Sequence, residues 1–150
     1  MLALTHLIAG AAVGTATGRR GAAVAGGLAA HLVLDGIGHD DAAVGPVAQG
    51  VIGLAGLAAL ASAWGPASPT MVGALAGAAP DSEVALWILL GRDPAFPLIF
   101  PSHWRRRDRV AEHPYRFPGT RVHIVIEGLI SVATCAALVA AGRRRRQRRR

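Results

Sequence analysis

The chain has 150 residues, room for one domain, and 52% of them are hydrophobic while only 5% are aromatic. Its mean hydropathy is +0.39, and the apolar residues are mainly small or aliphatic, which suits close helix packing better than a soluble core rich in aromatic side chains. All 16 basic residues are Arg, and seven of them lie within residues 143–150. These features exclude an ordinary soluble globular domain and a broad basic groove, and they predict an integral membrane protein.

Five apolar segments follow one another along the chain: Leu2–Thr17, Gly21–Gly38, Val44–Trp64, Thr70–Leu90 and Val122–Ala141. Each approaches the ~20 residues that a helix needs to cross a bilayer, or is short enough to be buried inside a bundle. The first lacks the basic start of a signal peptide, so we expect a retained helix. Pro80 is expected to break or kink the fourth at Ala79-Pro80. The predicted fold class is all-α, an integral membrane helical bundle of about four to five transmembrane helices.

Residues 91–121 separate the last two segments and contain five Pro and seven Arg. We expect an interfacial loop, with Trp104 and Tyr115 near headgroup depth. The transmembrane domain is then 1–142, and 143–150 form a basic C-terminal tail. No aromatic or folded module accompanies the tail, so we expect contact with anionic membrane lipids rather than specific nucleic-acid binding.

Orientation follows from the arginines. Arg19, Arg20 and the seven tail arginines lie on one side of the predicted topology, and the seven of the 91–121 loop lie on the other. The positive-inside rule therefore favours a multi-pass protein of the inner (plasma) membrane with a cytoplasmic C-terminus.

Glycines recur at intervals that bring helices close together. Gly10, Gly14 and Gly18 form a double GxxxG, and Gly73 with Gly77 forms another. We expect tight contact between helices of one chain rather than dimerisation, although the oligomeric state stays open.

Ionisable side chains inside membrane segments cost about 2.5–3.5 kcal/mol each on insertion scales and usually mark function. His31 and Asp35 are four residues apart and share a helix face, and His123 and Glu127 repeat that spacing. Two such pairs on different helices suit a dinuclear or trinuclear site for Zn²⁺ or a similar divalent ion. The single cysteine, Cys135, rules out a cysteine-based zinc site or a disulfide framework.

If the helices alternate in direction, the ionisable residues converge on one leaflet. That group comprises His6, His31, Asp35, His39, Asp81, Glu83, His123 and Glu127. Several have simpler explanations, which we keep open: His6 in the headgroup region, His39 at a helix end, and Asp81 as the cap of a second half-helix. We expect His103 and His113 to be solvated rather than ligating, and Glu83 to be the carboxylate left over for a base.

Three short stretches carry a family resemblance: Thr5-His6-Leu7-Ile8-Ala9-Gly10, Ala30-His31-Leu32-Val33-Leu34-Asp35 and Gly77-Ala78-Ala79-Pro80-Asp81-Ser82-Glu83. They resemble motifs of the LexA-regulated inner-membrane metal-dependent hydrolases, a family that looks related to zinc-dependent phospholipase C and S1/P1 nuclease. Of that family's His-Arg-Gly-x-Thr-His-Ser motif, the chain retains at most Pro101-Ser102-His103-Trp104, and the order of the motifs differs.

The resemblance implies six metal ligands, namely His6, His31, Asp35, Asp81, His123 and Glu127. The expected function is that of a membrane-embedded metal-dependent hydrolase-like protein, acting on phosphate esters or lipid headgroups with a divalent metal, zinc first. No catalytic residue and no organic cofactor is assigned. The alternative is a non-catalytic small multi-span membrane protein, either structural or a proton or ion relay.

Overall fold

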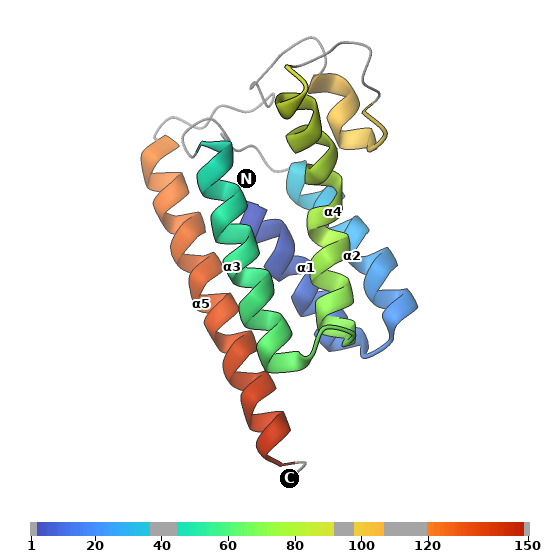
Figure 1. Cartoon of the computed structure of the whole chain (residues 1–150), viewed down its shortest axis with the longest axis vertical. Coiled ribbons are helices and arrows are strands. Elements are labelled where there is room, and N and C mark those ends of the chain that lie inside the picture. The colour runs from blue at the N-terminus through green and yellow to red at the C-terminus, as the bar shows by residue number, and fades with distance from the viewer. Residues whose placement is uncertain (1–2, 37–44, 92–97, 107–119, 149–150) are drawn as a thin grey trace.

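The computed structural model describes residues 3–36, 45–91, 98–106 and 120–148 (Figure 1). These residues form helices and no strand: α1 (Ala3–Thr17), α2 (Arg20–Asp35), α3 (Pro46–Trp64), α4 (Pro69–Leu89), the 3-10 helix η1 (Pro101–Arg106) and α5 (Thr120–Gln147). The predicted all-α fold is confirmed. Each of the five apolar segments corresponds to one of the α-helices, with ends that differ by a few residues.

Three helices are long and apolar enough to cross a membrane, over Val47–Trp64, Pro69–Leu89 and Val125–Gln147, and α1 is a shorter apolar helix. Large aliphatic side chains face outward, since Val47 is 79% exposed and Leu54 68%. Five of the seven largest fully buried side chains are polar, namely His6, His31, His103, Thr70 and Ser131. An apolar exterior, with polar side chains buried beside an aliphatic core, is the distribution expected of a bundle surrounded by lipid.

Helix α1 lies in the middle of the bundle and contacts all four other α-helices. Helices α3 and α5 run side by side along one flank, and α2 and α4 lie on the other (Figure 1). The packing of α1 on α4 depends on glycine, because a Cβ at Gly10 would meet the Gly73 carbonyl oxygen and one at Gly73 would meet the Gly10 carbonyl oxygen. The predicted intramolecular glycine contact is confirmed at these positions. Gly18 takes no part in it and has a φ of +64° just after α1.

Two predicted helix ends are wrong. Helix α4 is not broken at Pro80 but continues to Leu89, so Asp81 does not cap a second half-helix. Pro80 removes only one backbone donor, and packing of the helix against its neighbours outweighs that loss.

Helix α5 continues past Gly142 to Gln147. There, Trp64 Nε1 of α3 donates to the Leu138 carbonyl oxygen at 2.7 Å, and a Cβ at Gly142 would lie 2.7 Å from the same nitrogen. Because Gly142 has no side chain, the Trp64 indole packs against α5 at this position without interrupting the helix. Arginines in the last turn also interact favourably with the helix dipole.

Candidate metal centre

Five ionisable side chains from four elements meet at one end of the bundle: His6 of α1, His31 and Asp35 of α2, Asp81 of α4 and His103 of η1. They form two overlapping groups, His6–His31–Asp35 and His31–Asp81–His103, and within each group the ligand atoms lie within 4.8 Å of one another. The three histidines are at most 1% exposed. We call these five residues the His/Asp cluster.

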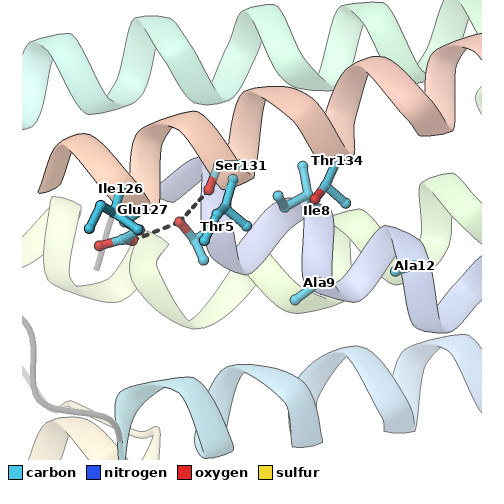
Figure 2. A pocket seen from close by; sticks show the side chains of 9 residues that line it. Thr5, Ile8, Ala9, Ala12, Ile126, Glu127, Ser131 and Thr134 are labelled. Carbon is cyan, nitrogen blue, oxygen red and sulfur yellow. Dashed lines mark hydrogen bonds between the residues drawn. The ribbon is translucent and has the colours of Figure 1, made fainter. Parts of the chain in front are cut away.

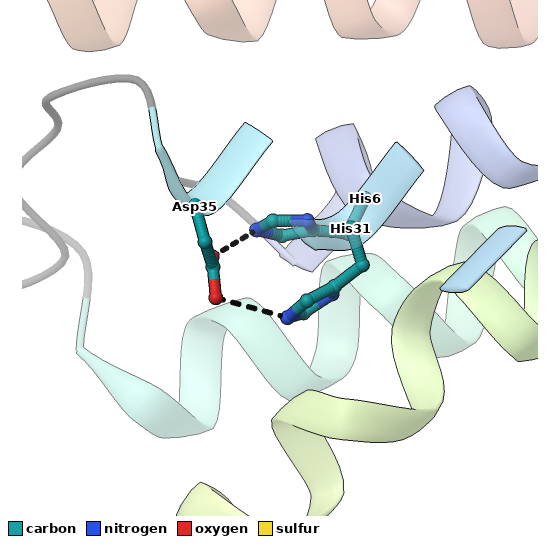
Figure 3. A group of neighbouring side chains, drawn as sticks. All are labelled: His6, His31 and Asp35. Atoms are coloured by element: carbon teal, nitrogen blue, oxygen red, sulfur yellow. Dashed lines mark ion pairs between the residues drawn. The ribbon is translucent and has the colours of Figure 1, made fainter. Parts of the chain in front are cut away.

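Asp35 is the centre of the cluster. Figure 3 shows its carboxylate, at the last residue of α2, reaching toward the rings of His6 and His31. Its Oδ2 lies 3.2 Å from His31 Nε2 and 3.3 Å from His103 Nε2, while Oδ1 lies 3.4 Å from His6 Nε2. Asp81 Oδ1 lies 3.8 Å from His31 Nε2 and 3.9 Å from His103 Nε2.

The facing nitrogen and oxygen atoms of the cluster lie 3.2–3.9 Å apart. Charge-assisted hydrogen bonds between nitrogen and carboxylate oxygen measure about 2.7–2.9 Å, and every distance just given is longer. Bonds of about 2.0–2.2 Å in tetrahedral geometry hold ligand atoms roughly 3.3–3.6 Å apart. The three distances from Asp35, 3.2–3.4 Å, lie close to that range, and the two from Asp81, 3.8 and 3.9 Å, lie beyond it.

Hydrogen bonds from the Nδ1 atoms of His31 and His103 fix the orientation of the two rings. His31 Nδ1 donates to the Gly77 carbonyl oxygen at 2.7 Å, and His103 Nδ1 donates to Glu83 Oε1 at 2.7 Å. A ring that carries its proton on Nδ1 presents a lone pair at Nε2, as a metal ligand must. The Nε2 atoms of His31 and His103 are buried and make no hydrogen bond. The donor set therefore fits a metal ion by both its chemistry and its orientation.

Glu83 does not have the role that the sequence predicts for it. Rather than being left over for a base, its carboxylate accepts the His103 bond and also bonds from the backbone N–H groups of Ile99, at 2.7 Å, and Phe100, at 3.0 Å. Ser102 Oγ donates to Asp35 Oδ2. The short segment that contains η1 is thus fastened to α2 and α4 through residues of the cluster and their immediate neighbours.

Four of the six predicted ligands come together, namely His6, His31, Asp35 and Asp81. Glu127 is not brought into the cluster and instead accepts a 2.7 Å hydrogen bond from Thr5 Oγ1. His123 belongs to α5, but its side chain lies outside the described residues, as do His39 and His113. Ligation by His123 stays a prediction.

The expectation that His103 is solvated is wrong. This side chain is completely buried, within reach of both Asp35 and Asp81. The sequence signal that could have found it is the Pro101-Ser102-His103-Trp104 stretch, in which both Ser102 and His103 contact Asp35. Helical spacing gives no hint of it, because His103 comes from η1, outside the apolar helices.

Comparisons of the chain with protein-family models, with curated proteins and with solved structures found no match.

Proposed function

We propose that the chain is a membrane-embedded, metal-dependent hydrolase-like protein that acts on phosphate esters such as lipid headgroups. The observation that carries the proposal is the pair of buried Nε2 atoms of His31 and His103, which make no hydrogen bond and converge on one oxygen of Asp35. Buried nitrogen atoms that make no hydrogen bond are rare in folded proteins and call for an explanation, and here the facing oxygen, Asp35 Oδ2, lies 3.2–3.3 Å away. A bound divalent cation, with Zn²⁺ as the first candidate, would provide that explanation.

The residues that would hold the ion are His31, His103, Asp35 and Asp81, and His6 lies beside His31 and Asp35. The Nε2 atom of His31 belongs to both groups, and one lone pair binds one ion. The described residues therefore favour a single ion over the dinuclear or trinuclear site expected from the sequence.

A divalent ion held there would act as a Lewis acid on a phosphoryl oxygen and would lower the pKa of the attacking water. In the hydrolysis, the water oxygen forms a bond to phosphorus, the phosphorus–oxygen bond to the alcohol breaks, and the alcohol leaves with a proton derived from the water. Ser102 holds the Asp35 carboxylate in place. The Asp35 side chain is only 2% exposed and that of Asp81 is 29% exposed, so a phosphate ester would approach from the side of Asp81.

The metal content of the purified protein tests this proposal. We expect the wild-type protein to retain a tightly bound divalent ion through purification, and Asp35→Ala to lose both the ion and cleavage of a phosphodiester. Glu127→Ala, which removes a carboxylate outside the His/Asp cluster, is the matched control and should keep both. Metal-free wild-type protein that stays folded would contradict the proposal and favour the non-catalytic structural or relay protein.

We further propose that the protein spans the inner (plasma) membrane several times with its C-terminus in the cytoplasm. Support comes from the count of arginines along the sequence, since Arg19, Arg20 and the seven of the tail stand on one side of the bundle against the seven of residues 91–121 on the other. The positive-inside rule assigns the side with more arginines to the cytoplasm.

A further inference from the structure

Two surface grooves of the bundle differ in the side chains that line them. The groove between α1 and α5 (Figure 2) has no basic residue in its lining, and its one carboxylate, Glu127, already accepts a hydrogen bond from Thr5 Oγ1. A second groove, of about 630 Å³, lies near the C-terminal end of α5. We call it the arginine groove, and it is lined by Ala137, Ala140, Ala141, Arg144, Arg145 and Arg148.

The arginine groove follows one face of α5. Ala141, Arg144 and Arg148 come four, seven and eleven residues after Ala137, and these spacings place them on the same side of a helix. From Ala137 to Arg148 this face extends for ~16 Å. The three arginines, Ala137 and Ala141 are all exposed. The groove is therefore an open surface with small apolar residues at one end and cations at the other.

The depth of this face in a bilayer follows from its surroundings. The apolar span of α5 is Val125–Gln147, and it packs beside Trp64, whose Nε1 donates to the Leu138 carbonyl oxygen at 2.7 Å. The Arg145 guanidinium lies 5.7 Å from the centre of the Trp64 ring. Tryptophan is enriched where a membrane meets water. The alanines of the groove therefore lie on the hydrocarbon side of the interface, and the arginines lie at headgroup depth.

The charge of the groove is not balanced by carboxylates in the part of the chain that the structure describes. None of the ion pairs between described side chains involves Arg144, Arg145 or Arg148. Guanidinium groups bind phosphate oxygens through charge-assisted hydrogen bonds, and basic residues beside a membrane helix are attracted to anionic lipids. Three cations above an apolar floor therefore match the phosphate and the acyl chain of one anionic lipid.

We infer that the arginine groove binds one anionic phospholipid, with its phosphate against Arg144 and Arg148 and the first part of an acyl chain along Ala137 and Ala141. The small alanine side chains let such a chain lie close to the helix backbone. The groove shares no residue with the His/Asp cluster, so the inference goes beyond the proposed function and does not require hydrolysis. It differs from a general attraction of the basic tail because it assigns the phosphate to particular arginines.

Charge-matched variants test the site. The probe is a phosphatidylglycerol with a fluorescent acyl chain, titrated into the purified full-length protein in nonionic detergent. Arg144→Gln with Arg148→Gln removes two charges from the groove, and Arg143→Gln with Arg146→Gln removes two from exposed positions of α5 outside it. We expect the first pair to weaken binding roughly tenfold more than the second. Equal loss in both pairs would overturn the site and leave only a diffuse attraction of the tail.

Filling the apolar end of the groove gives an independent measurement. Ala141→Phe places a ring where the acyl chain lies, and Ala55→Phe, on an exposed face of α3, is the matched control. We expect phosphatidylglycerol binding to fall in Ala141→Phe alone, and soluble glycerol phosphate, which has no acyl chain, to leave the lipid bound. Displacement by glycerol phosphate would overturn the lipid in favour of a free phosphate. Tighter binding of a single-stranded oligonucleotide than of the lipid would assign the groove to nucleic acid instead.

Discussion

Glu83 acts on the candidate centre through His103. Its carboxylate accepts a hydrogen bond from Nδ1–H of that ring and hydrogen bonds from the backbone N–H groups of Ile99 and Phe100. Partners of this kind orient a ligand and raise its basicity, and their loss typically lowers metal affinity 10–100-fold. We therefore predict that Glu83→Gln weakens Zn²⁺ binding by roughly 10–100-fold, measured by competition with a chelating dye in detergent.

Glu127→Gln is the control for that measurement, since the Glu127 carboxylate contacts Thr5 instead of the His/Asp cluster. Unchanged affinity in both variants would show that Glu83 has no positioning role. A loss of affinity in Glu127→Gln would instead restore the ligand role that the sequence predicts for it.

The site could be predicted from the sequence where it depends on local geometry. His31 and Asp35 are close because four residues of helix bring them to one face. The same four-residue spacing does not determine which neighbour a helix face contacts. On α5, Glu127 contacts Thr5 and not the cluster. His103 reaches the cluster through the segment that follows α4, a non-local placement that no helical period encodes.

Among the helices, the contact between α1 and α4 is the closest, and it leaves no space for a side chain at Gly73. We predict that Gly73→Ala destabilises the protein by about 1–3 kcal/mol, because the two backbones must separate to admit the methyl group. Thermal unfolding in detergent measures the change. The displacement should also weaken metal binding, since α1 carries His6 and α4 carries Asp81.

Gly50→Ala is the matched control for this substitution. A Cβ at Gly50, on α3, would meet nothing within 4 Å, and alanine favours a helix over glycine by about 1 kcal/mol. The control should be neutral or stabilising. If Gly73→Ala were also neutral, the close packing of α1 on α4 would be wrong.

The helices themselves could be predicted because the lengths of apolar runs reflect bilayer thickness. Whether these helices are interrupted at a given residue could not be predicted from the sequence. Pro80 and Gly142 are strong helix-breaking signals, yet both lie inside continuous helices. At Gly142 the reason is a tertiary contact with Trp64, which lies far away in sequence.

Charge is unevenly distributed among the side chains that the structure describes. The acidic side chains that the structure describes, Asp35, Asp81, Glu83 and Glu127, lie in the half of the bundle that holds the cluster, and the described arginine side chains lie at the other end. At the basic end, Arg20 Nε donates to the Ala67 carbonyl oxygen at 2.8 Å, and the Arg145 guanidinium lies 5.7 Å from the centre of the Trp64 ring. An indole beside cations is typical of a membrane interface.

Cysteine labelling in intact cells tests the orientation that this division implies. In a Cys135→Ser background, a membrane-impermeant maleimide should label Leu90→Cys, at the cluster end, from outside the cell. It should label Arg148→Cys only after the cells are permeabilised. The reverse pattern would place the C-terminus outside and the candidate centre on the cytoplasmic face.

Gly77 takes part both in the packing of α4 on α1 and in the orientation of a histidine of the cluster. A Cβ at this position would meet the carbonyl oxygen of His6, and its own carbonyl oxygen accepts the bond from His31 Nδ1. One point of close helix approach is therefore also the anchor of the His31 ring. Any tilt of α4 against α1, such as a change in bilayer thickness imposes, would move that anchor and turn the imidazole with it, so the lipid surroundings would alter the affinity for an ion bound at the candidate centre.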